Sequence, residues 1–560
     1  MGWSSWSTYR CTPGPSEALV EQQAAALHRL LQPHGYRYVN VDDCWYSGVD
    51  AYGRWATDPA RFPHGIAATA AYVHSLGLKF GIYLIPGIPV QAVQQNTPIE
   101  GTPYHARDII YDPPQYASTF RSSYKIDYTR PGAQAFIDSY ARLLASWGVD
   151  FVKLDSVAPG SSDNSFDTRQ DVQAWSTALR HSGRQIWLEL SWHLDIRSAR
   201  FWRAYANGWR VDDDIECYNS GSCSTLTAWA NPTGYVRDTI LARFFDAAPW
   251  AGSAGHGGWS NLDSLDIGNG AKDGLTPDER QTAMTLWAIA GSELYTGDDL
   301  TTLDSTGLAL LTNDEVIAVD QAGSPGSPVP SGDIWSSGPG YSDQQVWRAR
   351  EPDGSYAVAL FNLGAAPAAV TARWNDVGFC GAAQVRDLWA HRDLGSFPAQ
   401  FTATLAPHAS RLLRVTPTAA SPCPQPPPAP APAFYEAEAS GNTLSGGASV
   451  SSCSDCSGGQ KAGNLYNGGA VQFNSVTAPA AGTYRLTLYY ASGDERTGFV
   501  SVNGGPETTI GFFPATGGFS TVGTYTVQVQ LNAGQNTIKF ASHPGTYGPD
   551  LDRISIAPAS

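Results

Sequence analysis

The stretch "VDFVKLDS" (residues 149–156) is a short apolar run that ends in charged and polar residues. Similar runs recur along the first part of the chain: "YRYVNVDDCW" (36–45), "LKFGIYLI" (78–85), "RQIWLELS" (184–191), "GWRVDDDI" (208–215) and "SELYTGDD" (292–299). Stretches with helical spacing lie between them, such as "SEALVEQQAAALHRLLQ" (16–32), which Ser16 can cap. Two others, "AYVHSLG" (71–77) and "AFIDSYARLLASWG" (135–148), stop at a glycine, as helices commonly do. This alternation indicates parallel strands joined by helical crossovers.

We therefore predict a (β/α)8 TIM barrel over residues 1–320. An open doubly wound sheet is the alternative, and it is disfavoured because no Gly-rich phosphate-binding loop follows the first strand. Short alternating strands such as "SYAVALFNL" and "SRLLRVTP" then predict an antiparallel β domain over residues 321–417. A Pro-rich linker is expected over 418–433, and a second all-β unit, a β-sandwich, over 434–560.

Composition narrows the range of partners. The chain has 560 residues and a formal net charge of −16, and it contains no cluster of consecutive Lys and Arg residues. Nucleic acid is therefore not expected as a partner. No stretch approaches the ~18 unbroken apolar residues of a membrane span. The N-terminus lacks the basic and apolar regions of a signal peptide. We expect a soluble protein without a membrane partner that, if exported, has already been processed.

Cysteine usage favours a secreted, extracellular protein. The eight cysteines include two close pairs in turn-rich contexts, "CYNSGSC" (Cys217, Cys223) and "CSDC" (Cys453, Cys456). A zinc site at the second pair is the alternative, but no further pair of ligands lies nearby. Disulfides are the better interpretation.

Charged residues gather at the ends of the predicted barrel strands: Asp42 and Asp43, Lys153 and Asp155, and the run from Arg210 to Asp214. The C-terminal strand ends of a TIM barrel form the mouth of its active site. Because side chains alternate along a strand, Lys153 and Asp155 share a face. The same alternation places Arg210, Asp212 and Asp214 together, so the sequence leaves Asp212 and Asp214 as alternatives for a second acid.

Two acids on opposite walls of one pocket suit glycoside hydrolysis, in which one carboxylate attacks the anomeric carbon and the other protonates the leaving oxygen. Lys153 would keep Asp155 ionised, as a nucleophile requires. Trp6 and Trp45 are available to line a sugar pocket. Structural ion pairs at the loop bases are the alternative. A metal site is disfavoured because no histidine joins these acids.

Six motifs occur in an order that resembles glycoside hydrolase family 27, the α-galactosidase family: "MGWSSW" (1–6), "NVDDCW" (40–45), "GLKFGIY" (77–83), "FVKLD" (151–155), "WR" with the aspartates up to 214, and "GGWSNLDSLDIGN" (257–269). The resemblance covers about residues 1–417 and implies the barrel with its β domain. It implies that Asp155 is the nucleophile and Asp214 the acid/base. It also implies a disulfide between Cys11 and Cys44. The sugar-binding positions of the family fall on Trp6, Asp42, Asp43, Tyr83, Lys153 and Arg210.

The chain departs from the family pattern near the fifth strand. Where α-galactosidases usually carry Cys-Glu-Trp, facing O2 of the sugar, this chain has Leu190, Ser191 and Trp192. We expect Ser191 and Trp192 to contact the substrate in altered ways. A long loop, "LIPGIPVQAVQQNTPIEGTPYHARDII" (84–110), follows the third strand and can extend a binding cleft. Relatives with altered pockets include β-L-arabinopyranosidases and an isomaltose-releasing dextranase, so both stay as alternatives.

The last unit resembles carbohydrate-binding module family 35, a β-sandwich. That resemblance implies a structural calcium ion bound by Glu436, Glu438 and Asp552, and carboxylates suit this cation. Tyr466 and Tyr547 lie in Gly-rich loops and could carry a sugar on their rings. Solvated acids and exposed tyrosines without a ligand are the alternatives.

Taken together, the sequence predicts a secreted retaining exo-glycosidase that acts on terminal α-D-galactosides or a closely related pyranoside. Catalysis needs no cofactor in this scheme, and the partner is an oligo- or polysaccharide held by the last domain. A non-catalytic carbohydrate-binding protein is the alternative from another class. The subunit number stays open.

Overall fold

The computed structural model describes residues 1–160, 166–217, 225–230, 239–255, 257–329, 343–418, 432–513 and 515–558. These residues form two compact units, one up to residue 418 and the other from residue 432 onward. Most of the predicted linker, residues 419–431, lies outside the described ranges. None of the helices within those ranges is long and apolar enough to cross a membrane.

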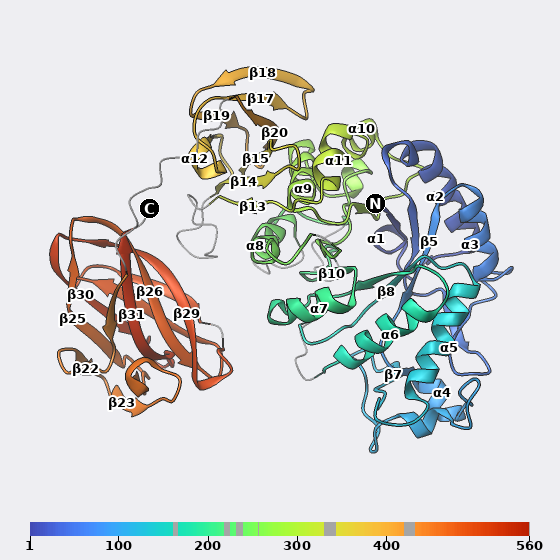
Figure 1. Cartoon of the computed structure of the whole chain (residues 1–560), viewed down its shortest axis with the longest axis horizontal. Helices are drawn as coiled ribbons and strands as arrows, with labels where there is room; N and C mark the ends of the chain where they lie inside the picture. Colours follow the sequence, from blue (N-terminus) through green and yellow to red (C-terminus); the bar gives the residue numbers. More distant parts are fainter. Residues whose placement is uncertain are drawn as a thin grey trace. The chain divides into compact units, whose positions relative to one another are not determined.

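Eight parallel strands form the predicted TIM barrel at the centre of the first unit (Figure 1). In sheet order they are β12 (Tyr295–Thr296), β1 (Gly2–Ser4), β2 (Tyr38–Val41), β5 (Lys79–Leu84), β8 (Phe151–Leu154), β9 (Trp187–Leu190), β10 (Gly208–Arg210) and β11 (Trp259–Asn261). The backbone N–H of Glu293, just before β12, donates to the carbonyl oxygen of Ser260 in β11 at 3.4 Å and links the two ends of the sheet.

Helices connect successive strands and lie outside the barrel (Figure 1). They are α2 (Glu17–Leu30), α3 (Ile66–Ser75), α5 (Ala133–Ser146), α6 (Arg169–His181), α7 (Ala199–Tyr205), α8 (Ile240–Trp250) and α9 (Pro277–Ala290), followed by α10 (Ser305–Leu311) and α11 (Asp314–Gln321). Helix α2 begins after Ser16 as predicted, because the Ser16 hydroxyl accepts a hydrogen bond from the Leu19 N–H at 3.3 Å. Its apolar stripe, including Val20 and Leu27, is buried.

The loops at the C-terminal ends of the strands carry short elements of their own. These are α1 (Trp6–Tyr9), β3 (Tyr46–Val49), β4 (Trp55–Thr57), β6 (Ile88–Pro89), α4 (Val90–Gln95), η2 (Ala106–Ile109) and β7 (Ser123–Tyr124). Inside the barrel, Gly208 permits close packing, because a Cβ atom there would lie 1.9 Å from Glu189 Oε2 and 2.0 Å from Glu293 Oε1. A glycine at the start of β10 therefore leaves room for these two buried carboxyl groups.

An antiparallel β domain completes the first unit. Its strands are β13 (Ser327–Pro328), β14 (Gln344–Arg350), β15 (Tyr356–Asn362), β16 (Ala368–Arg373), β17 (Ala383–Asp387), β18 (Arg392–Phe397), β19 (Gln400–Leu405) and β20 (Ser410–Pro417), with α12 (Trp374–Val377) between β16 and β17. It packs on α9, where the Thr282 hydroxyl donates to the His408 carbonyl at 2.7 Å and Trp389 Nε1 donates to the Thr285 hydroxyl at 3.0 Å. The barrel and the β domain thus share an interface.

The second unit is a β-sandwich of two antiparallel sheets, as predicted. One sheet contains β21 (Ala433–Glu436), β23 (Ser449–Ser452), β24 (Gln460–Gly463), β26 (Gly482–Ser492), β29 (Gly518–Leu531) and β31 (Asp550–Pro558). The other contains β22 (Thr443–Ser445), β25 (Ala470–Ala478), β27 (Arg496–Val502), β28 (Glu507–Phe513) and β30 (Gly534–Ala541). Apolar side chains including Val471, Leu486, Phe540 and Ile554 form its core.

Disulfides connect two of the predicted pairs, Cys11 with Cys44 and Cys453 with Cys456. The disulfide interpretation of the second pair is therefore confirmed in preference to zinc. Cys217 and Cys380 are also disulfide-bonded. Cys223, which shares the turn-rich stretch with Cys217, and Cys423 lie outside the described residues.

Candidate active site

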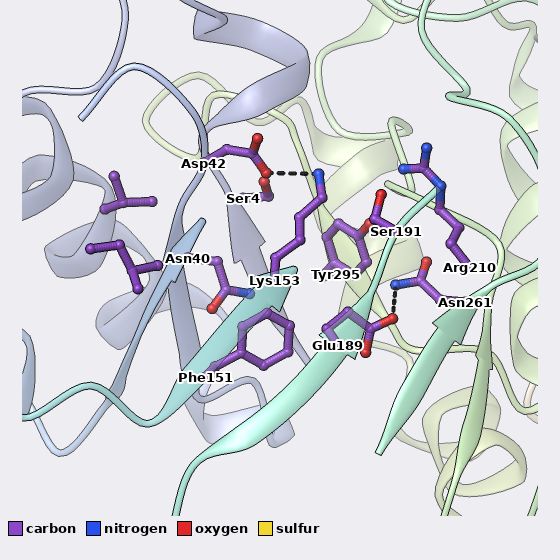
Figure 2. Close-up of a pocket in the computed structure, with 12 residues that line it drawn as sticks. Ser4, Asn40, Asp42, Phe151, Lys153, Glu189, Ser191, Arg210, Asn261 and Tyr295 are labelled. Carbon is purple, nitrogen blue, oxygen red and sulfur yellow. Dashed lines mark hydrogen bonds and ion pairs between the residues drawn. The ribbon is translucent and has the colours of Figure 1, made fainter. Parts of the chain in front are cut away.

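A cavity inside the barrel has lining residues on all eight strands or directly after them. Figure 2 shows four of the predicted substrate-binding residues around it, namely Asp42, Lys153, Ser191 and Arg210. Lys153 and Arg210 lie in β8 and β10, whereas Asp42 and Ser191 directly follow β2 and β9, and long stretches of sequence separate these strands. The barrel topology therefore gathers residues that the sequence motifs singled out one by one.

Asp155 lies directly after β8, next to two other predicted residues. Its Oδ2 accepts a hydrogen bond from the Tyr83 hydroxyl on the neighbouring strand β5 at 2.9 Å. Lys153 Nζ lies 2.9 Å from Asp42 Oδ2. Burial opposes the charge on Lys153, but Asp42 and Asp155 outweigh this effect and hold the pKa of the ammonium above its usual range. Lys153 is therefore a permanent cation between two carboxylates.

The paired aspartates after β2 are held by their own backbone. Asp42 Oδ1 accepts from the Asp43 N–H at 2.9 Å, and Asp43 Oδ1 accepts from the Cys44 N–H at 2.7 Å. Burial raises the pKa of Asp43, and the charges of Asp42 and Asp155 add to this effect. The remaining carboxylate oxygens are thereby fixed in direction, and Cys44 itself is fixed by its disulfide to Cys11.

Arg210 at the end of β10 binds two carboxylates. Its Nη2 donates to Asp214 Oδ1, and its Nη1 lies 2.9 Å from Asp263 Oδ1. Burial raises the pKa of Asp214; Arg210 opposes this shift, and the charges of Asp263 and Asp155 reinforce it. Asp214 thus keeps its proton to a higher pH than an ordinary aspartate, as a catalytic acid requires.

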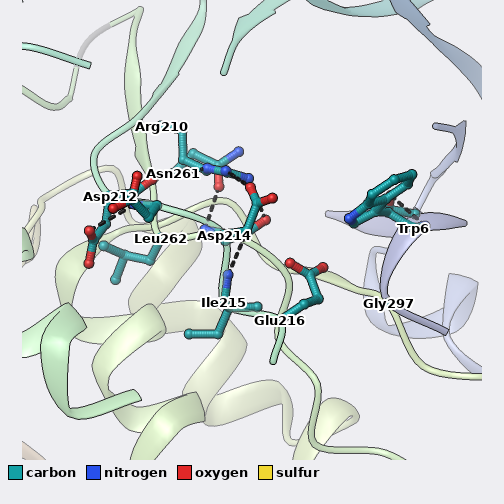
Figure 3. Close-up of polar contacts among 12 residues, drawn as sticks. Trp6, Arg210, Asp212, Asp214, Ile215, Glu216, Asn261, Leu262 and Gly297 are labelled. Atoms are coloured by element: carbon teal, nitrogen blue, oxygen red, sulfur yellow. Dashed lines mark hydrogen bonds and ion pairs between the residues drawn. The ribbon is translucent and has the colours of Figure 1, made fainter. Parts of the chain in front are cut away.

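The three consecutive acids after β10 have three different partners. Asp212 is fully buried and lies 2.5 Å from Arg243 Nη1, whereas Asp213 lies 3.1 Å from His193 Nδ1. Figure 3 shows Asp212 well apart from Asp214, which points to Arg210. The strand alternation that placed Asp212 with Arg210 does not extend to these residues, because β10 ends at Arg210.

Two corrections concern the surroundings of these acids. The expectation that no histidine joins them is wrong: one ligand atom each of His193, Asp212 and Asp213 lies within 4.8 Å of the others. Within that cluster Asp212 already pairs with Arg243. Trp45 does not line the cavity; it is fully buried and donates from Nε1 to the Tyr83 carbonyl at 2.9 Å.

Ser191 and Trp192 follow β9 directly. The Ser191 N–H donates to the Leu154 carbonyl at 3.0 Å, and the Val157 N–H donates to the Ser191 carbonyl at 2.8 Å. The Ser191 hydroxyl is buried and has no hydrogen-bond partner among the described residues. It lines the cavity, so it is available to a polar ligand there (Figure 2).

Sequence reasoning missed two acids beside Asp214. Asp263 follows β11 and accepts from the Tyr295 hydroxyl at 2.9 Å in addition to its contact with Arg210. Glu216 accepts from the Ser7 hydroxyl at 2.7 Å, and burial followed by the charges of Asp263 and Asp214 raises its pKa to about 8. Figure 3 shows Glu216 on the side of Asp214 that faces Trp6. The position of Asp263 after the seventh strand was a usable signal, whereas nothing in the sequence pointed to Glu216.

Neutralising Asp263 should move the basic limb of the pH–activity profile to lower pH. The family resemblance implies that Asp214 is the acid, which must be protonated to donate, and the negative charge of Asp263 helps to raise the pKa of Asp214. Asp263→Asn removes that contribution, so Asp214 loses its proton at lower pH. The measurement is kcat/KM against pH, with Asp314→Asn, an exposed acid on α11, as the control. A basic limb that stays in place or moves to higher pH would contradict this interpretation.

Comparisons with known proteins agree with this geometry. The family model described as alpha galactosidase A matches residues 1–93 and 123–322, and the alpha galactosidase C-terminal beta sandwich domain matches residues 341–415. An α-galactosidase from Coffea arabica is 32% identical over 423 residues, which cover 74% of this chain and 93% of that protein. The structure of a family 27 β-L-arabinopyranosidase from Geobacillus stearothermophilus matches with a TM-score of 0.64 and 32% identity, covering 75% of this chain and 96% of that one.

The second unit also has a counterpart. Residues 437–557 match the model for carbohydrate-binding module family 6. The expected resemblance to family 35 is therefore not confirmed, although the carbohydrate-binding class is. The structure of an isomalto-dextranase from Arthrobacter globiformis T6, complexed with panose, covers 99% of this chain and 96% of its own with a TM-score of 0.60 and 22% identity. That likeness shows a shared fold.

Proposed function

The chain belongs to the α-galactosidase family, glycoside hydrolase family 27, and we propose that it is a secreted, retaining exo-glycosidase that removes terminal α-D-galactosyl or closely related pyranosyl units. The main support for the proposal is that two acids, Asp155 and Asp214, have different surroundings. Asp155 accepts a hydrogen bond from Tyr83 and faces Lys153, while burial raises the pKa of Asp214. One acid is thus equipped to attack and the other to donate a proton.

The residues support a double displacement. Asp155 attacks the anomeric carbon while Asp214 gives its proton to the departing oxygen. Asp214 then takes a proton from water as the water attacks the glycosyl-enzyme. Asp42, Asp43 and Lys153 bind sugar hydroxyls, and no step needs a cofactor. Hydrolysis of an aryl glycoside separates this proposal from a non-catalytic carbohydrate-binding protein.

The glycone is proposed from the cavity. β-L-Arabinopyranose has the ring configuration of D-galactose without its C6 group, so the same polar residues can bind either sugar. The likeness to the β-L-arabinopyranosidase supports the smaller glycone as an alternative. Isomaltose release stays an alternative from the sequence. The Ser191 hydroxyl replaces the family carboxylate toward O2. Aryl α-galactoside, aryl β-L-arabinopyranoside and dextran, assayed side by side, decide the glycone, and turnover of none of them would contradict the proposed function.

The second unit is proposed to hold a polysaccharide near the barrel. Tyr466 and Tyr547 are exposed and their rings stack with centroids 4.3 Å apart, which offers a sugar an aromatic surface. Arg496 lies over the Tyr547 ring. These residues belong to two loops of one β-sandwich, so the surface does not depend on the barrel.

Removing residues 422–560 should leave kcat/KM for an aryl glycoside within about twofold, because the catalytic residues all lie in the first unit. Activity on a polymer should fall about tenfold or more, since tethering raises the effective substrate concentration. The separate module added back in solution serves as the control and should not restore polymer activity. A large loss with the aryl glycoside would show that the module takes part in the active site.

A calcium ion is proposed in the second unit. Glu436 Oε2 and Glu438 Oε2 are buried without a hydrogen-bond partner among the described residues. Asp552 is also buried, and its Oδ1 accepts from the Ser457 N–H at 2.9 Å. Ser457 donates as well to Glu436 Oε1, at 2.8 Å, so these carboxylates share one region. Unpartnered carboxylate oxygens of this kind fit a hard cation.

Chelation should lower the melting temperature of the second unit by about 10 °C, since a ligand at 100 times its Kd contributes about 2.7 kcal/mol. Calorimetry of the full chain with calcium or with EDTA measures this shift. Glu438→Gln should abolish the calcium dependence, whereas Glu507→Gln, an exposed acid in the same unit, should retain it. The same melting temperature with and without calcium would contradict the proposed calcium site.

Secretion is supported by the disulfides Cys11–Cys44 and Cys453–Cys456, because such bonds persist in oxidising compartments. The protein should therefore be found in the medium of the cells that make it naturally. Retention of all of it inside those cells, with reduced cysteines, would contradict this proposal.

A further inference from the structure

Residues 94–122 stand outside the two segments that match the family model, and they are anchored beside the active site. Strand β7, directly after them, pairs antiparallel with β6. The Ser123 hydroxyl donates to the Pro86 carbonyl at 2.6 Å. Because β5 ends at Leu84, this anchor lies at the C-terminal end of the strand whose Tyr83 contacts Asp155.

The end of this inserted segment forms a tight hairpin with an aromatic tip. The Ala117 N–H donates to the Ser123 carbonyl at 3.0 Å, and the Arg121 N–H donates to the Ser118 carbonyl at 3.2 Å. Phe120 at the tip is 55% exposed, the highest value among the large hydrophobic side chains of the described residues. This large apolar ring is therefore accessible to a ligand.

Trp192 lies on a segment that runs between the two catalytic strand ends. On one side, the Ser191 N–H donates to the carbonyl of Leu154, the residue before Asp155. On the other side, the Leu194 N–H donates to the Arg210 carbonyl at 3.0 Å, and Arg210 binds Asp214. Trp192 therefore stands at the rim between nucleophile and acid.

The hairpin brings Phe120 onto Trp192. The two rings lie within 13° of parallel, with centroids 6.1 Å apart. Ser191, one residue before Trp192, lines the cavity inside the barrel, so the aromatic pair lies beside that cavity. The apolar face of a pyranose packs well against such rings.

Given the proposed glycosidase function, we propose that Phe120 and Trp192 form a platform that binds the first sugar on the leaving-group side of the scissile bond. The occupant is a pyranose of an oligo- or polysaccharide, recognised by its C–H face. This platform makes the enzyme favour a saccharide over a small leaving group, and the inserted segment supplies half of it.

Three variants of the full chain test the platform: Phe120→Ala, Phe120→Leu and Phe120→Tyr. Each is assayed with a glycosyl fluoride, which has nothing to place on the rings, and with a trisaccharide of the same terminal glycone. The alanine and leucine variants should lower kcat/KM for the trisaccharide about tenfold, mainly through KM, and leave the fluoride within about twofold. The tyrosine variant should keep wild-type values because it keeps the ring.

Ile196→Ala serves as the matched control, since Ile196 is an exposed apolar residue on the same β9 loop and should alter neither substrate. The platform is overturned if trisaccharide turnover is unchanged in the alanine and leucine variants, if both substrates lose equally, or if the tyrosine variant falls with the leucine variant. Failure of the unaltered enzyme on both substrates would instead remove the proposed function. The two failures are therefore distinguishable.

Discussion

Asp155→Ala is expected to lower turnover by on the order of 10⁴-fold or more, because it removes the group that forms the covalent intermediate. Asp155 is only partly buried and contacts Tyr83 at the rim of the barrel, so the fold and its melting temperature should be retained. Steady-state hydrolysis of an aryl glycoside measures the loss. Asp167→Ala, an exposed acid in the loop after β8, is the matched control and should keep wild-type turnover.

Added azide or formate should restore part of the activity of Asp155→Ala, since a small anion fits where the carboxylate was. The product should then be a glycosyl azide or ester of inverted configuration. Rescue requires that the rest of the active site be intact, so it separates loss of the nucleophile from general damage. Full activity in Asp155→Ala, or a rescued product of retained configuration, would contradict the assignment.

The effect of Asp214→Ala on turnover should depend on the leaving group of the substrate. Substrates with poor leaving groups should lose about 10²–10⁴-fold in turnover, because they need a proton on the departing oxygen. Activated aryl glycosides should lose far less in the first step. The basic limb attributed to Asp214 should also disappear from the pH profile, because burial and the charges of Asp263 and Asp155 raise its pKa in the intact enzyme.

Asp212→Asn offers a matched control two residues away. Asp212 is fully buried against Arg243, so neutralising it should cost about 3–5 kcal/mol of stability and lower the melting temperature. It should not create a dependence on the leaving group. Equal losses for good and poor leaving groups in Asp214→Ala would place the acid elsewhere, and a leaving-group effect in Asp212→Asn would point to that residue instead.

The barrel could be predicted because its determinants are local. Each strand is a short apolar run that ends in charge, and each crossover helix shows its own spacing and stop signal, as α2 does with Ser16. The place of Asp155 at the mouth of the barrel could be predicted for the same reason, since it directly follows the strand that carries Lys153. Alternation along a strand failed for Asp212, which pairs with Arg243, because β10 ends at Arg210, two residues before it.

Contacts made across the barrel could not be predicted in this way. Asp263 reaches Arg210 from the next strand, and Glu216 reaches Ser7 from a loop more than 200 positions away in the chain. Trp45 was expected to line the cavity. It is instead packed in the interior, where its indole N–H donates to the Tyr83 carbonyl. Such outcomes depend on tertiary packing, which a strand pattern does not specify.

Asp155 and Asp214 are proposed to carry out a double displacement, and proton NMR of the first-formed sugar is the decisive measurement. The unaltered enzyme is given an aryl α-glycoside, and the anomeric signals are followed before mutarotation. We expect the α-anomer to appear first and the β-anomer to grow later, since two inversions retain configuration. A β-anomer formed first would contradict it and would remove Asp155 as the nucleophile.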